Sequence, residues 1–147
     1  MRLLERIGTP APIPVAAGQS SWRQSVLVLV EGPVGGDESL AAALPLGWHL
    51  ARDDPGHGTG TASGTAERLV LVAASRGSEV ARVRREHPDD PLLAMVPLMA
   101  DSSVVVEALE AGADACIRTS GAAVVASYLI AMQRRREMER VADLTRL

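Results

Sequence analysis

Three short apolar runs constrain the fold of this 147-residue chain more than any other feature of its sequence. They are Val26 to Val30, Leu69 to Ala73 and Leu92 to Val96. Every position in each run is apolar, whereas a strand with one face in water would alternate apolar and polar residues. Continuous runs of this kind are typical of parallel strands that are buried on both faces. We therefore expect a parallel sheet that is covered by helices on both sides.

The segments between these runs favour helices and two further strands. Short strands are expected at Trp48 to Arg52 and at Ala115 to Arg118. Helices are expected at Glu38 to Leu44 after a cap at Asp37, at Ser78 to His87 with Ser78 as the cap, at Ser102 to Ala111, and from Gly121 onward. Strands that alternate with helices form right-handed βαβ units. Five such strands fit an α/β fold, a flavodoxin-like (CheY-like) doubly wound parallel sheet in the order 2-1-3-4-5.

Shifts in composition divide the chain into three parts. Residues 1–22 contain Pro10, Pro12 and Pro14 and are predicted to be a flexible leader. Residues 23–133 form the α/β domain. Residues 134–147 extend the last helix as a linker or a dimer stalk, with its charged side chains mostly in solvent. Residues 53–66 are rich in Gly and Thr, so the second helix of the fold is predicted to be lost or replaced by a loop.

Charge and hydropathy exclude two classes of partner. The formal net charge is −3, and the chain has no basic block beyond Arg134, Arg135 and Arg136, which argues against direct nucleic-acid binding. The longest apolar stretch contains Pro97 and is far shorter than the roughly 20 residues of a membrane span, so no membrane contact is expected. Cys116 is the only cysteine, which favours a reducing compartment. We expect a cytoplasmic protein.

The chain contains no lysine, and this absence excludes several kinds of chemistry. All of its 15 basic Lys or Arg positions are arginine, so a P-loop and a Schiff-base enzyme are both ruled out. The histidines at 49, 57 and 87 and the thiol of Cys116 lack the short paired spacings of a zinc site, and no Gly-x-Ser-x-Gly motif is present. A buried thiol without reactivity is the favoured interpretation of Cys116. We expect no catalytic residue, no metal, no cofactor and no enzymatic activity.

The segment from Pro91 to Arg136 carries the most specific pattern in the chain. It contains Glu-Ala-Leu-Glu-Ala-Gly-Ala-Asp from Glu107 to Asp114, then Cys-Ile-Arg-Thr, then a helix that ends in three arginines. This order resembles the second half of a response-regulator receiver domain. The resemblance implies a flavodoxin-like domain in bacterial two-component (phosphorelay) signalling, with an influence on transcription through a partner or through an output domain.

The same resemblance implies that the phosphorylation pocket is degenerate. The family's first strand ends in two acidic residues that hold magnesium, and these positions fall on Glu31 and Gly32. The phosphoacceptor aspartate falls on Ala73, the switch hydroxyl on Pro97 and the lysine on Thr119. Alanine offers no nucleophilic carboxylate, and Glu31 alone supplies one of the several oxygen ligands that Mg²⁺ requires. The pattern predicts a pseudo-receiver that cannot be phosphorylated.

Two modes of action remain open. In receivers, the fourth helix, fifth strand and fifth helix form the face that binds partners, and the resemblance places Val105, Leu109, Arg118 and Tyr128 there. A protein partner or a homodimer would use this face. Alternatively, the vacated pocket could bind a small molecule, because parallel sheets present ligand sites at the carboxyl ends of their strands. Glu31, Gly35, Ala73, Pro97 and Thr119 would then line it.

Overall fold

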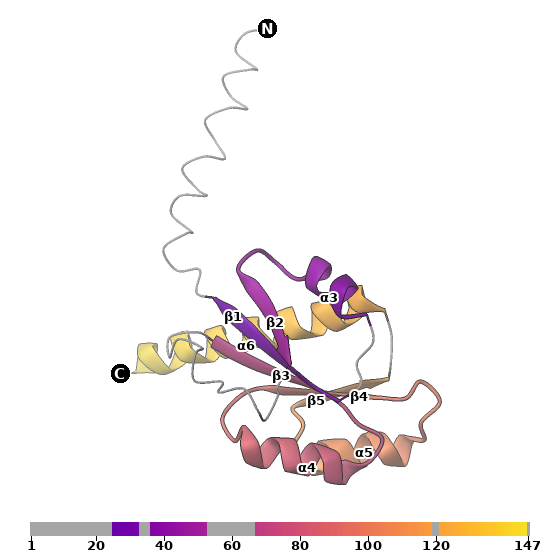
Figure 1. Ribbon diagram of the computed structural model, residues 1–147. Coiled ribbons are helices and arrows are strands. Elements are labelled where there is room, and N and C mark those ends of the chain that lie inside the picture. The colour runs from indigo at the N-terminus through magenta and orange to yellow at the C-terminus, as the bar shows by residue number, and fades with distance from the viewer. Residues whose placement is uncertain (1–24, 33–35, 53–66, 119–120, 147) are drawn as a thin grey trace, which may run out of the picture.

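The computed structural model describes residues 25–32, 36–52, 67–118 and 121–146 (Figure 1). In chain order the elements are β1 (Val26–Glu31), α3 (Asp37–Ala43), β2 (Trp48–Arg52), β3 (Glu67–Ala73), α4 (Gly77–Glu86), β4 (Leu92–Val96), α5 (Ser102–Glu110), β5 (Ala115–Arg118) and α6 (Ala122–Arg146). Strands and helices alternate along these residues, except that the next described element after β2 is β3.

The described strands form one parallel sheet in the order β2-β1-β3-β4-β5, which confirms the predicted topology. The three apolar runs become the three central strands. All five residues of β4 are buried, as are the middle four residues of β3. Central strands have helices over both faces and neighbours at both sides, so an apolar side chain is favoured at every position. The edge strands β2 and β5 are less buried.

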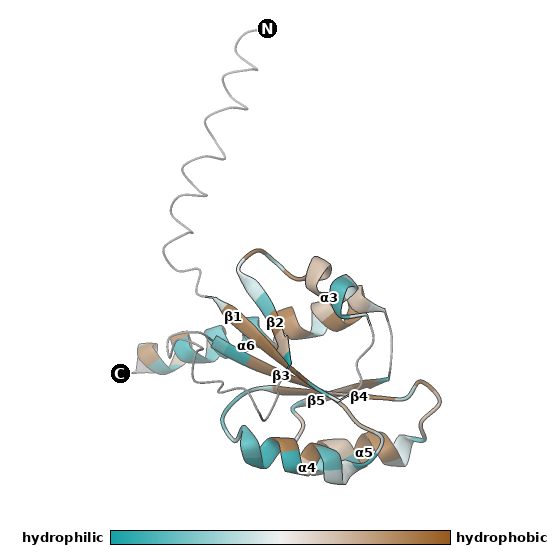
Figure 2. Cartoon of the chain, in the orientation of Figure 1, coloured by the Kyte–Doolittle hydropathy of each residue, from teal (hydrophilic) through white to brown (hydrophobic). Residues whose placement is uncertain are grey.

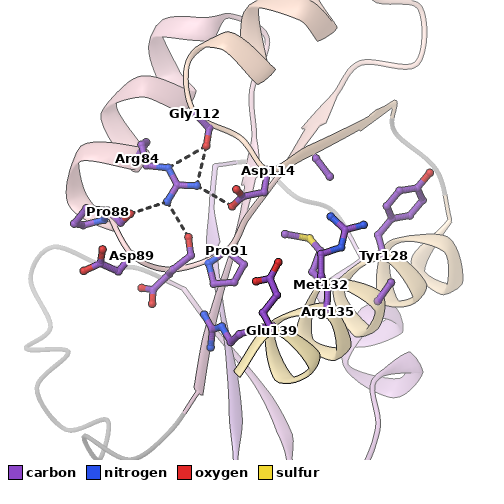
Figure 3. Close-up of a pocket in the computed structure, with 14 residues that line it drawn as sticks. Arg84, Pro88, Asp89, Pro91, Gly112, Asp114, Tyr128, Met132, Arg135 and Glu139 are labelled. Atoms are coloured by element: carbon purple, nitrogen blue, oxygen red, sulfur yellow. Dashed lines mark hydrogen bonds and ion pairs between the residues drawn. The ribbon is translucent and has the colours of Figure 1, made fainter. Parts of the chain in front are cut away.

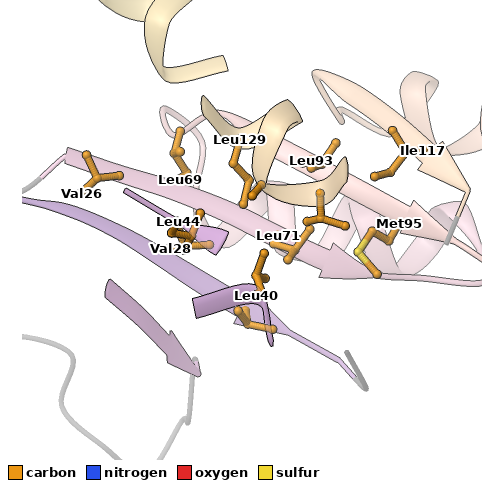
Figure 4. Close-up of a cluster of buried hydrophobic side chains, with 13 residues drawn as sticks. Val26, Val28, Leu40, Leu44, Leu69, Leu71, Leu93, Met95, Ile117 and Leu129 are labelled. Carbon is orange, nitrogen blue, oxygen red and sulfur yellow. The ribbon is translucent and has the colours of Figure 1, made fainter. Parts of the chain in front are cut away.

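Each face of the sheet has its own hydrophobic cluster. Alternate residues of β3 point to opposite faces, since side chains in a strand have a period of two. Leu69 and Leu71 pack with Leu129 of α6 on the face that α3 and α6 cover (Figure 4). Val70 and Val72 belong to the second cluster, which α4 and α5 cover. The molecule is therefore a three-layer sandwich (Figure 1), and hydropathy colouring shows the central strands as mostly apolar and α4 as largely polar (Figure 2).

Most predicted element boundaries are accurate to within one residue. The strands β2, β4 and β5 have the bounds that the sequence predicts, and β3 begins two residues earlier at Glu67. The predicted caps at Asp37 and Ser78 are wrong, because both residues lie inside their helices. The α4 start is instead held by Glu79, whose Oε1 accepts hydrogen bonds from the backbone nitrogens of Ser75 (2.8 Å) and Arg76 (3.1 Å). The predicted leader and the predicted loss of the second helix lie outside the described residues.

The C-terminal half of α6 is attached to the start of β3 by a carboxylate. Oε1 of Glu67 accepts hydrogen bonds from Nη1 of Arg136 at 2.8 Å, Nη2 of Arg140 at 2.6 Å and Nε2 of Gln133 at 3.2 Å. Nη2 of Arg136 also donates to the carbonyl oxygen of Arg68 at 2.8 Å. The expectation of a solvent-exposed charged face is therefore wrong for Arg136, whose side chain is only 17% exposed. The helix stays against the sheet as far as Arg140.

Among the residues that the structure describes, no helix has both the length and the apolar character required to cross a membrane.

Candidate functional site at the carboxyl edge of the sheet

The chain positions that the resemblance assigns to phosphorylation meet at the carboxyl edge of the central strands. Glu31 ends β1 and is paired with Val72, and Ala73 ends β3 beside Met95 of β4. Pro97 follows β4 directly and is exposed. The structure thus brings Glu31, Ala73 and Pro97 to adjacent strand ends. Thr119 and Gly35 lie outside the described residues.

Gly32 is fixed at this edge by close backbone packing. Its φ angle is 86°, in the left-handed region that favours glycine. A Cβ atom built on Gly32 would lie 2.7 Å from the carbonyl oxygen of Ala73. An acidic side chain at this position therefore does not fit without movement of the β3 backbone. The second metal-binding carboxylate expected of the family is absent in sequence, and the backbone leaves no room for it.

Ala73 offers only a methyl group where the family has its nucleophile. The side chain is partly buried and packs against the cluster that contains Leu71 and Met95. Next along the chain, the backbone nitrogen of Ala74 donates to the carbonyl oxygen of Met95 at 2.8 Å. This part of the edge is apolar packing and backbone hydrogen bonding.

Glu31 belongs to a salt-bridge network with α4. Its carboxylate is nearly buried, and Oε1 lies 3.6 Å from Nη2 of Arg82. Nη1 of Arg82 lies 3.3 Å from Oε2 of Glu86. Glu31, Glu86 and His87 each present one possible metal-binding atom, and these atoms lie within 4.8 Å of one another. Because the guanidinium of Arg82 already contacts both carboxylates, a divalent cation would have to compete with it for the same oxygens.

The grouping of Glu31, Glu86 and His87 is not evident from the sequence. Its only signal was the adjacent pair Glu86 and His87 at the predicted end of a helix. Nδ1 of His87 lies 3.6 Å from Oδ2 of Asp90, so the imidazole also has an acidic neighbour. The cluster is best described as a mixed network of charges with its one arginine between two carboxylates.

Arg52 and Arg118 support the loops at the same edge. Arg52 ends β2, donates from Nη1 to the carbonyl oxygen of Gly32 at 2.6 Å, and forms two hydrogen bonds of 3.1 and 3.0 Å with the carboxylate of Asp37. Arg118 ends β5 and donates from Nε to the carbonyl oxygen of Ala100 at 3.2 Å. Both guanidinium groups therefore act here as backbone supports.

The predicted partner face spans both layers and the edge strand. Val105 and Leu109 lie one turn apart on α5, where Leu109 is 44% exposed and Val105 is partly buried. Tyr128 is 43% exposed on α6, in the opposite layer, with β5 between the two helices (Figure 1). Leu98 and Met99, in the loop after β4, are also strongly exposed, which the sequence analysis did not single out. This side of the molecule carries exposed apolar side chains on several elements.

Cys116 lies within β5 and is partly buried. Burial raises the pKa of its thiol, and the nearby charge of Arg118 opposes this shift. A raised pKa lowers the fraction of thiolate at neutral pH, which is the reactive form. The geometry is consistent with a structural thiol.

Arg84 holds the opposite, amino edge of the sheet (Figure 3). Its Nε and Nη2 donate to the carbonyl oxygen of Gly112 at 3.0 and 2.8 Å, and Nη2 also binds Oδ2 of Asp114 at 2.9 Å. Its Nη1 donates to the carbonyl oxygens of His87, Pro88 and Asp90. The Gly-Ala-Asp end of the receiver-like motif is thus bound to α4, and it serves the fold at the edge that is remote from Ala73.

A cavity of about 750 Å³ lies beside Arg84 at this amino edge. The loop of residues 88–91 and the start of β5 form one side of it, and Tyr128, Met132 and Arg135 of α6 form another (Figure 3). Glu31, Ala73 and Pro97 do not line it. The cavity therefore lies at the amino edge of the sheet, away from the carboxyl-edge positions that would line a small-molecule pocket.

The fold is similar to that of a solved protein described as a response regulator from Thermotoga maritima. The TM-score is 0.54 and the sequence identity is 18%, and the match covers 72% of this chain and 94% of the other. This similarity shows a receiver-like, flavodoxin-like fold. No protein-family model matches the chain. No curated protein sequence matches it either.

Proposed function

We propose that this chain is a pseudo-receiver, a receiver-like domain that acts in cytoplasmic regulatory signalling through protein contacts and without phosphorylation or enzymatic activity. One observation carries the proposal. At the carboxyl edge of the sheet, the nucleophile position is Ala73, and Gly32 packs so closely on the Ala73 carbonyl that a second acidic side chain has no space. A site without a carboxylate nucleophile cannot form an acyl phosphate.

The remaining acidic residue does not compensate for this loss. Glu31 lies beside the guanidinium of Arg82, and Mg²⁺ requires several oxygen ligands in near-octahedral geometry. The chain also has no lysine that could contact a phosphoryl group as an ammonium. Signal output in this protein would then depend on which protein is bound.

Incubation with acetyl phosphate, or with beryllofluoride, in the presence of Mg²⁺ tests the first half of the proposal. We expect no gain of covalent mass and no change in the backbone amide NMR spectrum. A phosphoryl mass gain, or Mg²⁺-dependent shifts at residues around Ala73, would contradict the proposal. A standard receiver domain treated in parallel serves as the positive control.

The second half concerns the partner face of Val105, Leu109, Arg118 and Tyr128. A charge at the exposed Leu109 should abolish binding of any protein that docks there, since interface cores exclude unpaired charges. Wild-type protein, Leu109→Glu and Leu46→Glu are compared as baits in cell extract. Leu46 is 88% exposed between α3 and β2, so its variant is the matched control. A partner retained by Leu109→Glu would contradict the use of this face.

A further inference from the structure

The outward surface of α6 has a stripe of small and apolar side chains that the fold leaves uncovered, interrupted by Arg134 and Arg135. Residues three and four positions apart lie on one face of a helix. Val124, Tyr128 and Ala131 follow this spacing, and Met138 and Ala142 continue the same face two turns further on, beyond Arg134 and Arg135; all five are exposed. The residues of α6 that face the sheet, such as Val125 and Leu129, lie on the opposite side of the helix and are buried.

The second half of this stripe is hollowed into a shallow groove of about 440 Å³. Six residues of α6 line it, namely Ala131, Arg134, Arg135, Met138, Glu139 and Ala142. Alanine at both ends of the groove permits close approach of another helix, since the distance between helix axes depends on the side chains at the contact. Met138 is 65% exposed in the middle of the groove.

The groove is complementary to itself when one copy is reversed. A two-fold axis that crosses α6 between Arg136 and Glu137 places Ala131 opposite Ala142 and Arg135 opposite Met138 of the second copy. Tyr128 then lies opposite Thr145. These pairs are the successive layers of an antiparallel helix pair, and each contact occurs twice because a two-fold interface is isologous.

Charge favours the antiparallel direction. Arg135 and Glu139 lie on the same flank of the stripe, and reversal brings Arg135 within about one residue, or roughly 1.5 Å along the axis, of Glu139 of the second copy. Within the described residues, neither side chain forms a hydrogen bond or ion pair, although they are four positions apart on one helix. A parallel, in-register pair would instead put both Arg135 guanidinium groups in one layer, where like charges repel.

We propose that α6 pairs antiparallel with α6 of a second copy of this chain through the groove between Ala131 and Ala142. This inference goes beyond the proposed function, because it depends on the outward face of α6, which shares only Tyr128 with the predicted partner face, and not on the phosphorylation pocket or on Leu109. The interface is small, so the dimer should form in a concentration-dependent manner.

Cysteine pairs test the proposed direction in full-length protein that carries Cys116→Ser. A mixture of Ala131→Cys and Ala142→Cys proteins should form a disulfide-linked heterodimer on mild oxidation, and neither protein alone should cross-link. In the antiparallel pair, position 131 of one copy lies 11 residues from position 131 of the other, or roughly 16 Å. Self-cross-linking of each single variant would indicate a parallel pair, and no cross-linking in the mixture would indicate that α6 is unpaired. Either result overturns the proposal.

Charge reversal gives an independent readout by sedimentation equilibrium. Arg135→Glu and Glu139→Arg should each weaken self-association about tenfold, and a mixture of the two variants should recover wild-type affinity because every cross-pair is again opposite in sign. Arg85→Glu on α4 changes the net charge as Arg135→Glu does, so it is the matched control and should associate normally. A monomeric wild-type protein at all concentrations, or a mixture no tighter than its components, overturns the proposal. Failure of the dimer in either experiment would not change the outcome of the acetyl phosphate test, so the two proposals can fail separately.

Discussion

The two edges of the sheet use the same side chain, arginine, in settings of different burial. At the amino edge, the side chains of Arg84 and Arg136 are 22% and 17% exposed, while that of Arg140, which also contacts Glu67, is 50% exposed. At the carboxyl edge, those of Arg52 and Arg82 are 46% and 51% exposed. Exposed ion pairs contribute little to stability, whereas charged hydrogen bonds that are partly shielded from water contribute more. The contrast indicates that the arginines of the amino edge contribute more to the stability of the fold than those of the carboxyl edge.

The largest expected effect is the loss of Arg84. Arg84→Ala removes hydrogen bonds to four carbonyl oxygens and to Asp114, and several of these acceptors would be left partly buried without a donor. We expect destabilisation of about 4 kcal/mol in urea unfolding. Arg85→Ala, at the exposed neighbouring position, is the control and should change stability by less than about 0.5 kcal/mol. Equal effects of the two substitutions would contradict a stabilising role for the Arg84 contacts at the amino edge.

Acid should weaken the attachment of α6 at the same edge. Burial alone would raise the pKa of Glu67, but hydrogen bonds from Arg140, Arg136 and Gln133 more than offset it and lower the pKa from 4.5 to about 2. A carboxyl group whose pKa is lower in the folded state than in the unfolded state stabilises the fold at pH values above the unfolded-state pKa. This contribution is lost as the pH falls from 4.5 to about 2.

The size of this acid effect should be roughly 3 kcal/mol, since each pKa unit corresponds to about 1.4 kcal/mol. It is measured as the difference in pH dependence of unfolding between wild-type protein and Glu67→Gln, which cannot titrate at this position. The variant should be less stable at neutral pH and should lack this part of the acid transition. Parallel pH profiles for the two proteins would contradict the assignment.

A smaller effect is expected at Gly112. Its φ angle is 124°, and a Cβ atom there would lie 2.8 Å from Cγ of Arg84. Gly112→Ala should therefore cost about 2 kcal/mol through backbone strain and displacement of Arg84. Gly121→Ala is the control, because a Cβ at Gly121 meets no atom within 4 Å, and we expect a cost of about 0.5 kcal/mol. A harmless Gly112→Ala would show that the Arg84 contacts tolerate displacement.

The smallest expected effect is that of magnesium at the carboxyl edge. Millimolar Mg²⁺ should leave the Tm of the wild-type protein unchanged, because a ligand stabilises a protein only when it binds the folded state. Arg82→Ala removes the guanidinium that contacts Glu31 and Glu86, so any stabilisation by Mg²⁺ should appear first in this variant. An increase in the Tm of the wild-type protein with Mg²⁺ would contradict the expectation that the carboxyl edge does not bind this ion.

The sheet could be predicted from the sequence because each buried strand is recognisable from a short run of neighbouring residues. The runs at Val26, Leu69 and Leu92 each indicate a buried strand, and alternation with helices restricts the topology. The end of β3 at Ala73 was also predictable, because the apolar run stops at this residue. The packing of Gly32 was not predictable, since it depends on the distance between two strand ends.

The arginine contacts could not be predicted for a related reason. Arg84 binds Asp114, 30 residues away, and Arg140 binds Glu67, 73 residues away. The sequence contains 15 arginines and 18 acidic residues, so composition does not identify the pairs. The sequence of the last helix could not show that Arg136 would be shielded by the start of β3.

The close approach of Gly32 to the Ala73 carbonyl also limits which substitutions the carboxyl edge can accept. Replacing Ala73 with aspartate would restore a nucleophile, but an acidic residue at position 32 would still meet the β3 carbonyl at 2.7 Å. The backbone would have to shift before the second substitution became tolerable, and that shift gives no benefit by itself. No single substitution in this chain can therefore supply both an aspartate at position 73 and an acidic side chain at position 32.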